Sequence, residues 1–333
     1  MAESASAPVP RTAANGAQRR SWARLKGGRT LIALMALLAF NALFTRDFLT
    51  LQTLNINLSQ VAQVVVVAMG MALVIATGGI DLSVGAVAAF AGTLAAVLLT
   101  QDSGALAQPG VALLAALTLP LLAAALCGWM NGLLITRYGV QPIVATLVLF
   151  IAGRGLAEML TNSNLRTFAP ERLDWLRSNL LGLPFQAWLM AAVVAVTAWV
   201  VRRTLFARRL VAVGGNARAA HLAGVPVARV KLIAYAVCAA LAGLAGVMNV
   251  AMISAADPAK IGLNIELDAI AAVAVGGTLL SGGRIDIVGT LLGALAIQLL
   301  DYTLLAHGVP NEYALIAKAT IILLAVFLQR RGK

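Results

Sequence analysis

The chain has 333 residues, of which 61% are hydrophobic and only 11% are charged, and it carries a net charge of +12. Soluble domains are about half apolar and a quarter charged, so this composition excludes a water-soluble globular protein. The positive charge does not indicate nucleic-acid binding, because the basic residues lie between apolar runs and form no basic face or recognised module. We therefore expect a protein of the lipid bilayer that binds no nucleic acid.

The first 29 residues differ from the rest of the chain. Residues 1–18 are rich in Ala, Ser and Pro, a composition typical of disorder, and five basic residues follow them up to Arg29. The apolar run 31–44 resembles a signal peptide, but no convincing small-x-small cleavage site follows it. We predict that residues 1–29 form a disordered basic cytoplasmic tail and that an uncleaved first membrane helix comes next.

Ten apolar segments then follow in chain order. A helix that crosses a bilayer needs roughly 20 mostly apolar residues. The candidate spans are 30–45, 58–77, 83–100, 111–134, 142–160, 185–201, 232–253, 267–280, 287–305 and 313–328. The eighth is too short to cross comfortably on its own. The sequence predicts an all-α integral membrane protein with about ten transmembrane helices, and a permease domain over residues 30–330.

Charge fixes the expected orientation of these helices. If the N-terminus is cytoplasmic, most of the 25 basic residues lie in cytoplasmic segments, as the positive-inside rule requires. Ten spans then place the C-terminus in the cytoplasm as well. The long polar segment 161–184 falls outside and the long basic segment 202–231 falls inside. Antiparallel helices need only short connections, so we expect the inner loop to have a function of its own.

An internal repeat connects two halves of the chain. The sequence GGIDLSVG at 78–85 matches GGTLLSGG at 276–283, and each copy lies between two apolar runs. Six predicted spans separate the copies, so both should have the same orientation. Transporters are often built from such repeats, with broken helices at the transport site. We predict that the pathway is lined by Gly78, Gly79, Asp81, Ser83, Gly276, Gly277, Thr278 and Ser281.

Asp81 has two compatible interpretations. A charge at membrane depth is costly and marks a functional candidate. Asp81 or Ser83 could also accept hydrogen bonds from the free amides that begin the third helix. The repeat glycines likewise allow a second interpretation, in which they only permit close helix packing.

Polar side chains also begin the second predicted helix. Amides donate and accept hydrogen bonds, which suits sugar hydroxyls, although an interfacial position explains them equally well. The pathway candidates here are Asn55, Asn57, Gln60 and Gln63, whereas Asn131 and Gln141 are interpreted as structural.

Two charged pairs are expected inside or beside the membrane. Arg154 and Glu158 are four residues apart on one helix and are predicted to form an ion pair near the outer interface. Asp301 and Lys318 lie at matching depths on the ninth and tenth spans, which form a hairpin. A lone charge there would be costly, so we predict an ion pair between them.

Signals for metal or bond-making chemistry are weak. Cys127 and Cys238 lie in apolar runs and are interpreted as reduced packing residues, and the two histidines, His221 and His307, are far apart. We find no Gly-x-Ser-x-Gly, His-Glu-x-x-His or Gly-x4-Gly-Lys-[Ser/Thr] motif. We predict no metal, no cofactor and no enzymatic activity, and any ATP hydrolysis would belong to another chain.

Three motifs together carry a family resemblance. They are GGIDLSVG at 78–85, GGNARAAHLAG at 214–224, and ELDAIAA at 266–272 leading into GGTLLSGGR at 276–284. Their order and spacing resemble the ribose/galactofuranose-type permeases of bacterial ABC sugar importers, from the first helix to the C-terminus. The inner loop is similar to the Glu-Ala-Ala-x3-Gly motif of ABC importers, with Arg218 where Glu is usual.

The resemblance implies a division of labour. It implies a multi-pass permease in the bacterial inner (plasma) membrane that works with an ABC ATPase, a periplasmic sugar-binding protein and a second permease chain, identical or related. Segment 202–231 would be the cytoplasmic coupling loop. Its ATPase-coupling residues would be Gly214, Gly215, Asn216, Ala219, Ala220 and Gly224. The sequence does not identify the sugar.

Two alternatives remain from sequence. An ion-coupled secondary transporter of a small polar solute would use buried acids such as Asp81 or Asp301 as relays. The inner loop argues against it, since such a carrier needs no ATPase docking segment. A membrane-embedded enzyme would need a cluster of acids or histidines that the sequence lacks.

Overall fold

The computed structural model describes residues 30–101 and 104–330. The predicted tail, residues 1–29, lies outside the described residues. Each of the ten predicted membrane segments is helical over most of its length. The long helices are Thr30–Phe44, α2 (Leu51–Ala76), α3 (Val84–Leu99), α4 (Pro109–Arg137), α5 (Pro142–Thr161), α7 (Phe185–Arg203), α10 (Val227–Ile253), α11 (Ile265–Val275), α12 (Ile287–Ala306) and α13 (Asn311–Arg330).

Six of the described helices are long and apolar enough to cross a membrane. These are α2, α4, α5, α7, α10 and α12, whereas Thr30–Phe44 and α3 are apolar but shorter. The expected eighth span, 267–280, is corrected. Helix α11 ends at Val275, and residues 276–280 form a turn, because the Gly276-Gly277 pair ends the helix there.

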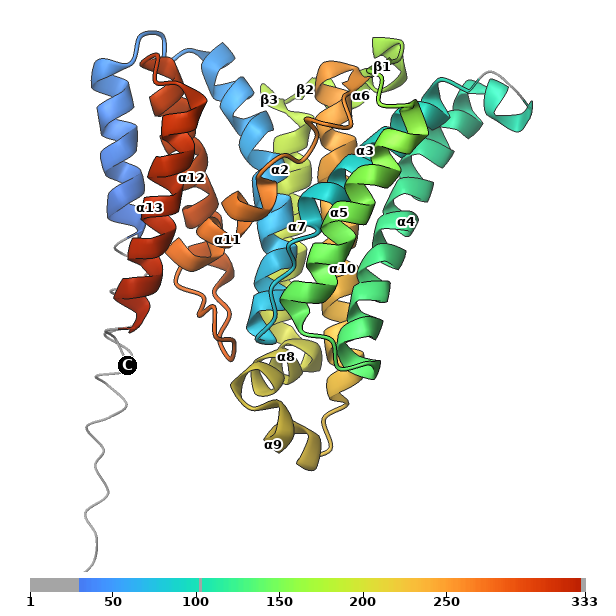
Figure 1. The fold of residues 1–333 in the computed structure, drawn as a ribbon. Helices are drawn as coiled ribbons and strands as arrows, with labels where there is room; N and C mark the ends of the chain where they lie inside the picture. Colours follow the sequence, from blue (N-terminus) through green and yellow to red (C-terminus); the bar gives the residue numbers. More distant parts are fainter. Residues whose placement is uncertain (1–29, 102–103, 331–333) are drawn as a thin grey trace, which may run out of the picture.

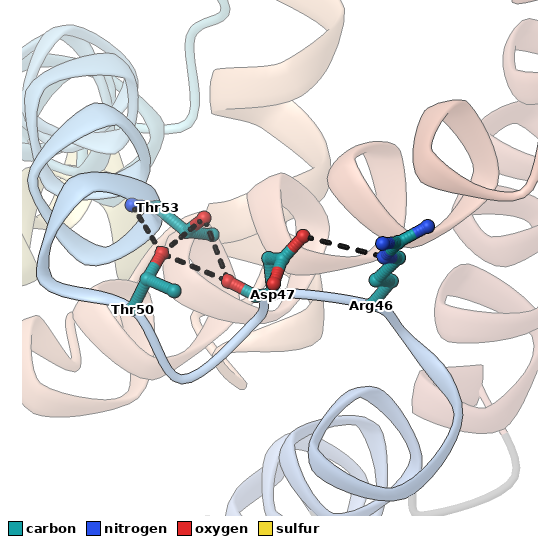
Figure 2. Close-up of polar contacts among 4 residues, drawn as sticks. All are labelled: Arg46, Asp47, Thr50 and Thr53. Carbon is teal, nitrogen blue, oxygen red and sulfur yellow. Dashed lines mark hydrogen bonds and ion pairs between the residues drawn. The ribbon is translucent and has the colours of Figure 1, made fainter.

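Helix α2 begins seven residues earlier than its predicted span. Thr50 is the N-cap, and its hydroxyl accepts a hydrogen bond from the Thr53 amide at 3.2 Å. The Thr50 and Thr53 hydroxyls both donate to the Asp47 carbonyl oxygen at 2.9 Å (Figure 2). This N-terminal cap outweighs the weak apolar character of the first two turns. The helix is therefore about 39 Å long at 1.5 Å per residue, longer than the membrane core.

Short elements lie at the two ends of the bundle. At one end are the 3₁₀ turns η1 (Gly104–Ala107) and η2 (Pro170–Arg172), helix α6 (Asp174–Arg177), and four two-residue strands, so the fold is nearly rather than wholly helical. Strand β1 (Arg166–Thr167) pairs antiparallel with β4 (Ala255–Ala256), and β2 (Asn179–Leu180) pairs with β3 (Leu183–Pro184). At the opposite end are α8 (Leu205–Gly215), α9 (Ala217–Leu222) and the last turns of α13 (Figure 1).

The core lies around α2, α3 and α10. Every α2 residue from Val61 to Ala76 is buried, and α10 packs against α2, α3 and α4. Small residues bring these backbones close together. A Cβ added at Gly246 of α10 would overlap the Ala88 carbonyl oxygen of α3, so this crossing requires glycine.

Candidate functional site

The two glycine segments adopt the same turn. In the first, Gly78 has φ +83° and the Gly79 amide donates to the Val74 carbonyl oxygen at 3.4 Å. In the second, Gly277 has φ +88° and the Thr278 amide donates to Val273 at 3.2 Å. Both bonds span six residues, as in a Schellman turn. The structural repeat is therefore displaced by one residue from the sequence match, because Gly78 corresponds to Gly277 and not to Gly276.

Asp81 lies in a buried hydrogen-bonded network at the start of α3. Its Oδ1 accepts from the Ser83 amide at 2.9 Å and from the Ser83 hydroxyl at 2.5 Å. The Asn131 amide of α4 in turn donates to the Ser83 hydroxyl at 3.1 Å. Asp81 thus binds the amide of the N-cap residue, one position before the helix proper, and Ser83 itself makes no capping bond. Among the described residues, Asp81 Oδ2 has no hydrogen-bond partner.

The second copy is built differently after its turn. Asp286 caps α12, because its carboxylate accepts from the Gly289 amide at 2.9 Å. The Thr278 hydroxyl accepts from the Asp286 amide at 3.0 Å, and the Thr278 side chain is fully buried. Gly276 packs against the Gly289 backbone, with no room for a Cβ. Close packing therefore explains Gly276, whereas Ser281 is exposed.

The three sequence motifs meet at one point. The Gly283 amide donates to the Ala76 carbonyl oxygen at 3.0 Å, which joins the second glycine segment to the end of α2. A Cβ at Gly282 would lie 2.7 Å from the Gly78 nitrogen and 3.0 Å from the Gly214 oxygen. A Cβ at Gly214 would overlap the Ala76 oxygen. We call residues 76–79, 214–215 and 281–283 the glycine junction. The end of α8 therefore contacts the end of α2 and the second glycine segment through backbone atoms.

A short helix lies in the segment expected to be the coupling loop. Helix α9 begins at Ala217, and the Asn216 side chain caps it by accepting from the Ala219 amide at 3.0 Å. The helix that precedes it, α8, lies where the sequence predicts only loop. Ala220 is buried against the bundle, whereas Leu222 is 81% exposed. The turn at Gly224 has φ +81° and is also exposed, and no atom lies within 4 Å of where a Cβ would stand.

The α2 amides do not form one site. Gln63 is buried and its carbonyl oxygen accepts from Asn249 of α10 at 2.9 Å. Gln60 is exposed, and its oxygen accepts from Gln298 of α12 at 3.1 Å. Asn57 donates back to the Thr53 carbonyl oxygen at 2.9 Å. Among described residues, the Asn55 and Asn57 side-chain oxygens are buried without partners.

The ion pair between Asp301 and Lys318 is confirmed, and it has a third member. Lys318 Nζ lies 2.6 Å from Asp301 Oδ2 and 2.7 Å from Asp268 Oδ1 on α11. The expected Arg154–Glu158 pair is wrong. Arg154 instead donates to the Pro258 and Ile261 carbonyl oxygens at 2.7 and 2.8 Å, because the loop before α11 presents free carbonyls to it.

Comparison with known proteins shows which protein family the chain belongs to. The family described as branched-chain amino acid transport system / permease component matches residues 54–326. The chain belongs to this family. The ribose import permease protein RbsC of Escherichia coli (strain K12) is 39% identical over 308 residues, which cover 91% of this chain and 93% of that protein.

Other relatives have sugar-permease names as well. The galactofuranose transporter permease protein YtfT of Escherichia coli (strain K12) is 39% identical over 82% of this chain and 78% of its own length. The L-arabinose ABC transporter permease protein AraH of Azospirillum brasilense is 31% identical over 97% and 94%. No solved structure matches the chain significantly. This family member is a multi-pass transport subunit of the inner (plasma) membrane.

Proposed function

We propose that this permease is the membrane subunit of an ATP-driven ABC importer that carries a monosaccharide across the inner membrane. The observation that carries the proposal is the 39% identity to a ribose import permease over 91% of the chain. The partners would be an ABC ATPase, which hydrolyses the ATP, a periplasmic sugar-binding protein, and a second permease chain in a homo- or heterodimer. Co-purification from the native membrane tests the partners. Recovery of the tagged chain without an ATPase would contradict the proposal.

The proposed topology has ten membrane helices and cytoplasmic termini, with a permease domain over residues 30–330 and a coupling loop at 202–231. Support comes from α8, α9 and the last turns of α13, which lie at the same end of the bundle (Figure 1). The inner loop is also rich in arginine, as the positive-inside rule requires of a cytoplasmic segment.

The proposed pathway uses the two glycine segments and the α2 amides. Turns that end helices inside the bundle free backbone amides and carbonyls, which can bind a neutral sugar without fixed charge. The first segment, Gly78 to Ser83, and the second, Gly276 to Ser281, would form the inner gate. Both adjoin the glycine junction, where Gly214 at the end of α8 packs against Ala76 and Gly283. A movement of α8 and α9 imposed by the ATPase would therefore reach the gate directly.

Accessibility of single cysteines is expected to follow the gate. Ser281 is exposed, whereas Ser83 and Thr278 are fully buried. In the assembled complex, Ser281→Cys should react with a small water-soluble thiol reagent at rest. Ser83→Cys and Thr278→Cys should react only when ATP is supplied. If all three stay inert in a complex that transports, the segments are packing elements and the gate lies elsewhere.

Gly224→Leu is expected to uncouple ATP hydrolysis from transport. The position lies at the exposed end of α9, where a large side chain would keep the ATPase from a close approach. We expect sugar moved per ATP to fall about fivefold or more, with normal insertion in the membrane. Gly139→Leu is the matched control, since Gly139 also has positive φ and open space around it. Equal transport by both variants would show that α9 is not the docking helix.

A further inference from the structure

A cavity with polar groups in a largely apolar wall lies between the outer halves of α2 and α12, away from the glycine junction. Its volume is about 260 Å³, far above the ~15 Å³ that one water needs. Four polar side chains line it, Gln60, Gln298, Asp301 and Tyr302, together with apolar residues of α2, α12, α13 and the connection between the last two. The cavity is therefore large enough for a small organic molecule and mixes amide, carboxylate and phenol groups.

The cavity has unused hydrogen-bonding groups. Gln298 donates to Gln60 at 3.1 Å, and among described residues this is the one bond that either side-chain amide makes. The Gln60 nitrogen and the Gln298 oxygen therefore remain free to donate and to accept. Asp301 Oδ1 also has no hydrogen-bond partner in the described part of the chain. A donor and two acceptors within one cavity suit a ligand whose hydroxyls can do both.

Lys318 fixes the carboxylate at the wall of the cavity. Its ammonium lies 2.6 Å from Asp301 Oδ2, which leaves Oδ1 as the free oxygen. Because Asp268 binds the same ammonium at 2.7 Å, two carboxylates face one cation. An excess of negative charge disfavours anionic ligands such as sugar phosphates and favours neutral hydroxyl donors.

The cavity places a carboxylate among apolar side chains. Ile56 and Leu305, which also line it, are exposed apolar residues. Asp301 is 24% exposed at the cavity, about 8 Å from the end of α12 at 1.5 Å per residue. A partly exposed carboxylate inside the membrane faces the bundle interior or water rather than lipid.

We propose that this cavity is a binding subsite for a neutral monosaccharide in the outer part of the pathway. Gln60 and Gln298 would bind the hydroxyls, and Asp301, positioned by Lys318, would accept from one of them. The inference rests on the proposed function, and it adds a site that the glycine segments do not supply. It also predicts selection against charged sugars within the membrane subunit itself.

The test uses the permease reconstituted in proteoliposomes with its ATPase and binding protein. D-ribose, L-arabinose and D-fructose are supplied in turn. In Gln298→Leu, uptake should fall about tenfold, because the Gln298 contact to the sugar is lost and Gln60 loses the partner that positions it, while ATP hydrolysis stays within about twofold. Gln52→Leu, an exposed α2 position outside the cavity, is the control and should leave both rates unchanged. Unchanged uptake, or a parallel loss of ATP hydrolysis, would overturn the subsite.

A labelling experiment does not depend on the stability of Gln298→Leu. Gln60→Cys is introduced with Cys127 and Cys238 replaced by alanine, and the complex is treated with a charged methanethiosulfonate. A saturating amount of the transported sugar should slow the reaction about fivefold or more. Both reactions are also run without nucleotide, so that ATP-driven conformational changes do not alter the accessibility of the cysteine. No protection in a complex that transports that sugar overturns the subsite alone. If the wild-type complex takes up none of the three sugars, the proposed function fails instead.

Discussion

Replacing Lys318 with methionine is expected to destabilise the permease by about 3–5 kcal/mol. The ammonium is the shared partner of Asp268 and Asp301, at 2.7 and 2.6 Å. The three side chains are only 12–24% exposed, so the variant would leave two carboxylates close together with no cation. Removing one partner of a buried ion pair costs far more than replacing the whole set by neutral groups. Thermal unfolding of the purified protein in detergent measures the loss.

Combined substitutions can show whether Asp268, Asp301 and Lys318 form one interacting group or act as three independent charges. Asp301→Asn alone should cost less than Lys318→Met, because the Lys318–Asp268 pair at 2.7 Å remains. Adding Lys318→Met to Asp301→Asn should deepen the loss, because Asp268 is left without a cation, and adding Asp268→Asn should then recover part of it. Exposed Lys260, which pairs with Asp257 at 3.4 Å, is the control, and Lys260→Met should cost less than about 1 kcal/mol. Additive losses in the combined variants would mean that the three charges do not interact.

Gly282→Ala is expected to abolish or strongly reduce transport. The residue has φ +84°, and its Cβ would lie 2.7 and 2.8 Å from the Gly78 nitrogen and Cα. Alanine therefore meets both left-handed backbone strain and a backbone clash, so the glycine junction must separate. Each effect costs about 1–3 kcal/mol. Measurement of transport and of thermal unfolding in the same preparation gives both consequences.

Gly277→Ala separates the cost of backbone strain from the cost of the backbone clash. Gly277 has nearly the same φ, +88°, but no atom lies within 4 Å of the place where its Cβ would stand, so only the backbone strain applies. We expect this variant to retain most of its transport activity. If Gly277→Ala and Gly282→Ala lose equal activity, the contact between the segments is not what matters, and the junction does not couple the loop to the gate.

The positions of the helices were largely predictable, because ten apolar runs leave few alternatives for a chain in a bilayer. The exceptions have local causes. Thr50 caps α2 before its apolar run begins, and the Gly276-Gly277 pair ends α11 inside its own. Helix α8 was missed because its arginines resemble a loop, although Ala207, Leu210 and Val213 pack its buried side.

The motifs that form the glycine junction were each predicted, but their meeting was not. Their contact depends on how three segments that are far apart in the chain pack, which no local pattern reports. The same holds for Asp268, which joins the predicted Asp301–Lys318 pair from a third helix. Asn131 is interpreted from sequence as structural at a turn, yet its amide reaches the Ser83 hydroxyl. Asn131 lies within the apolar run 111–134, and a polar side chain there needs a buried hydrogen-bond partner, which is the signal that could have predicted this contact.

Reconstituted transport tests whether this permease is the membrane subunit of an ATP-driven sugar importer. The purified permease is placed in proteoliposomes with the ATPase and the binding protein, and uptake of radiolabelled D-ribose, L-arabinose and D-fructose is followed. We expect uptake of at least one sugar that requires ATP and all three proteins and that is unaffected by collapse of the proton and sodium gradients. Uptake by the permease alone, driven by either ion gradient and indifferent to ATP, would contradict it and establish an ion-coupled carrier.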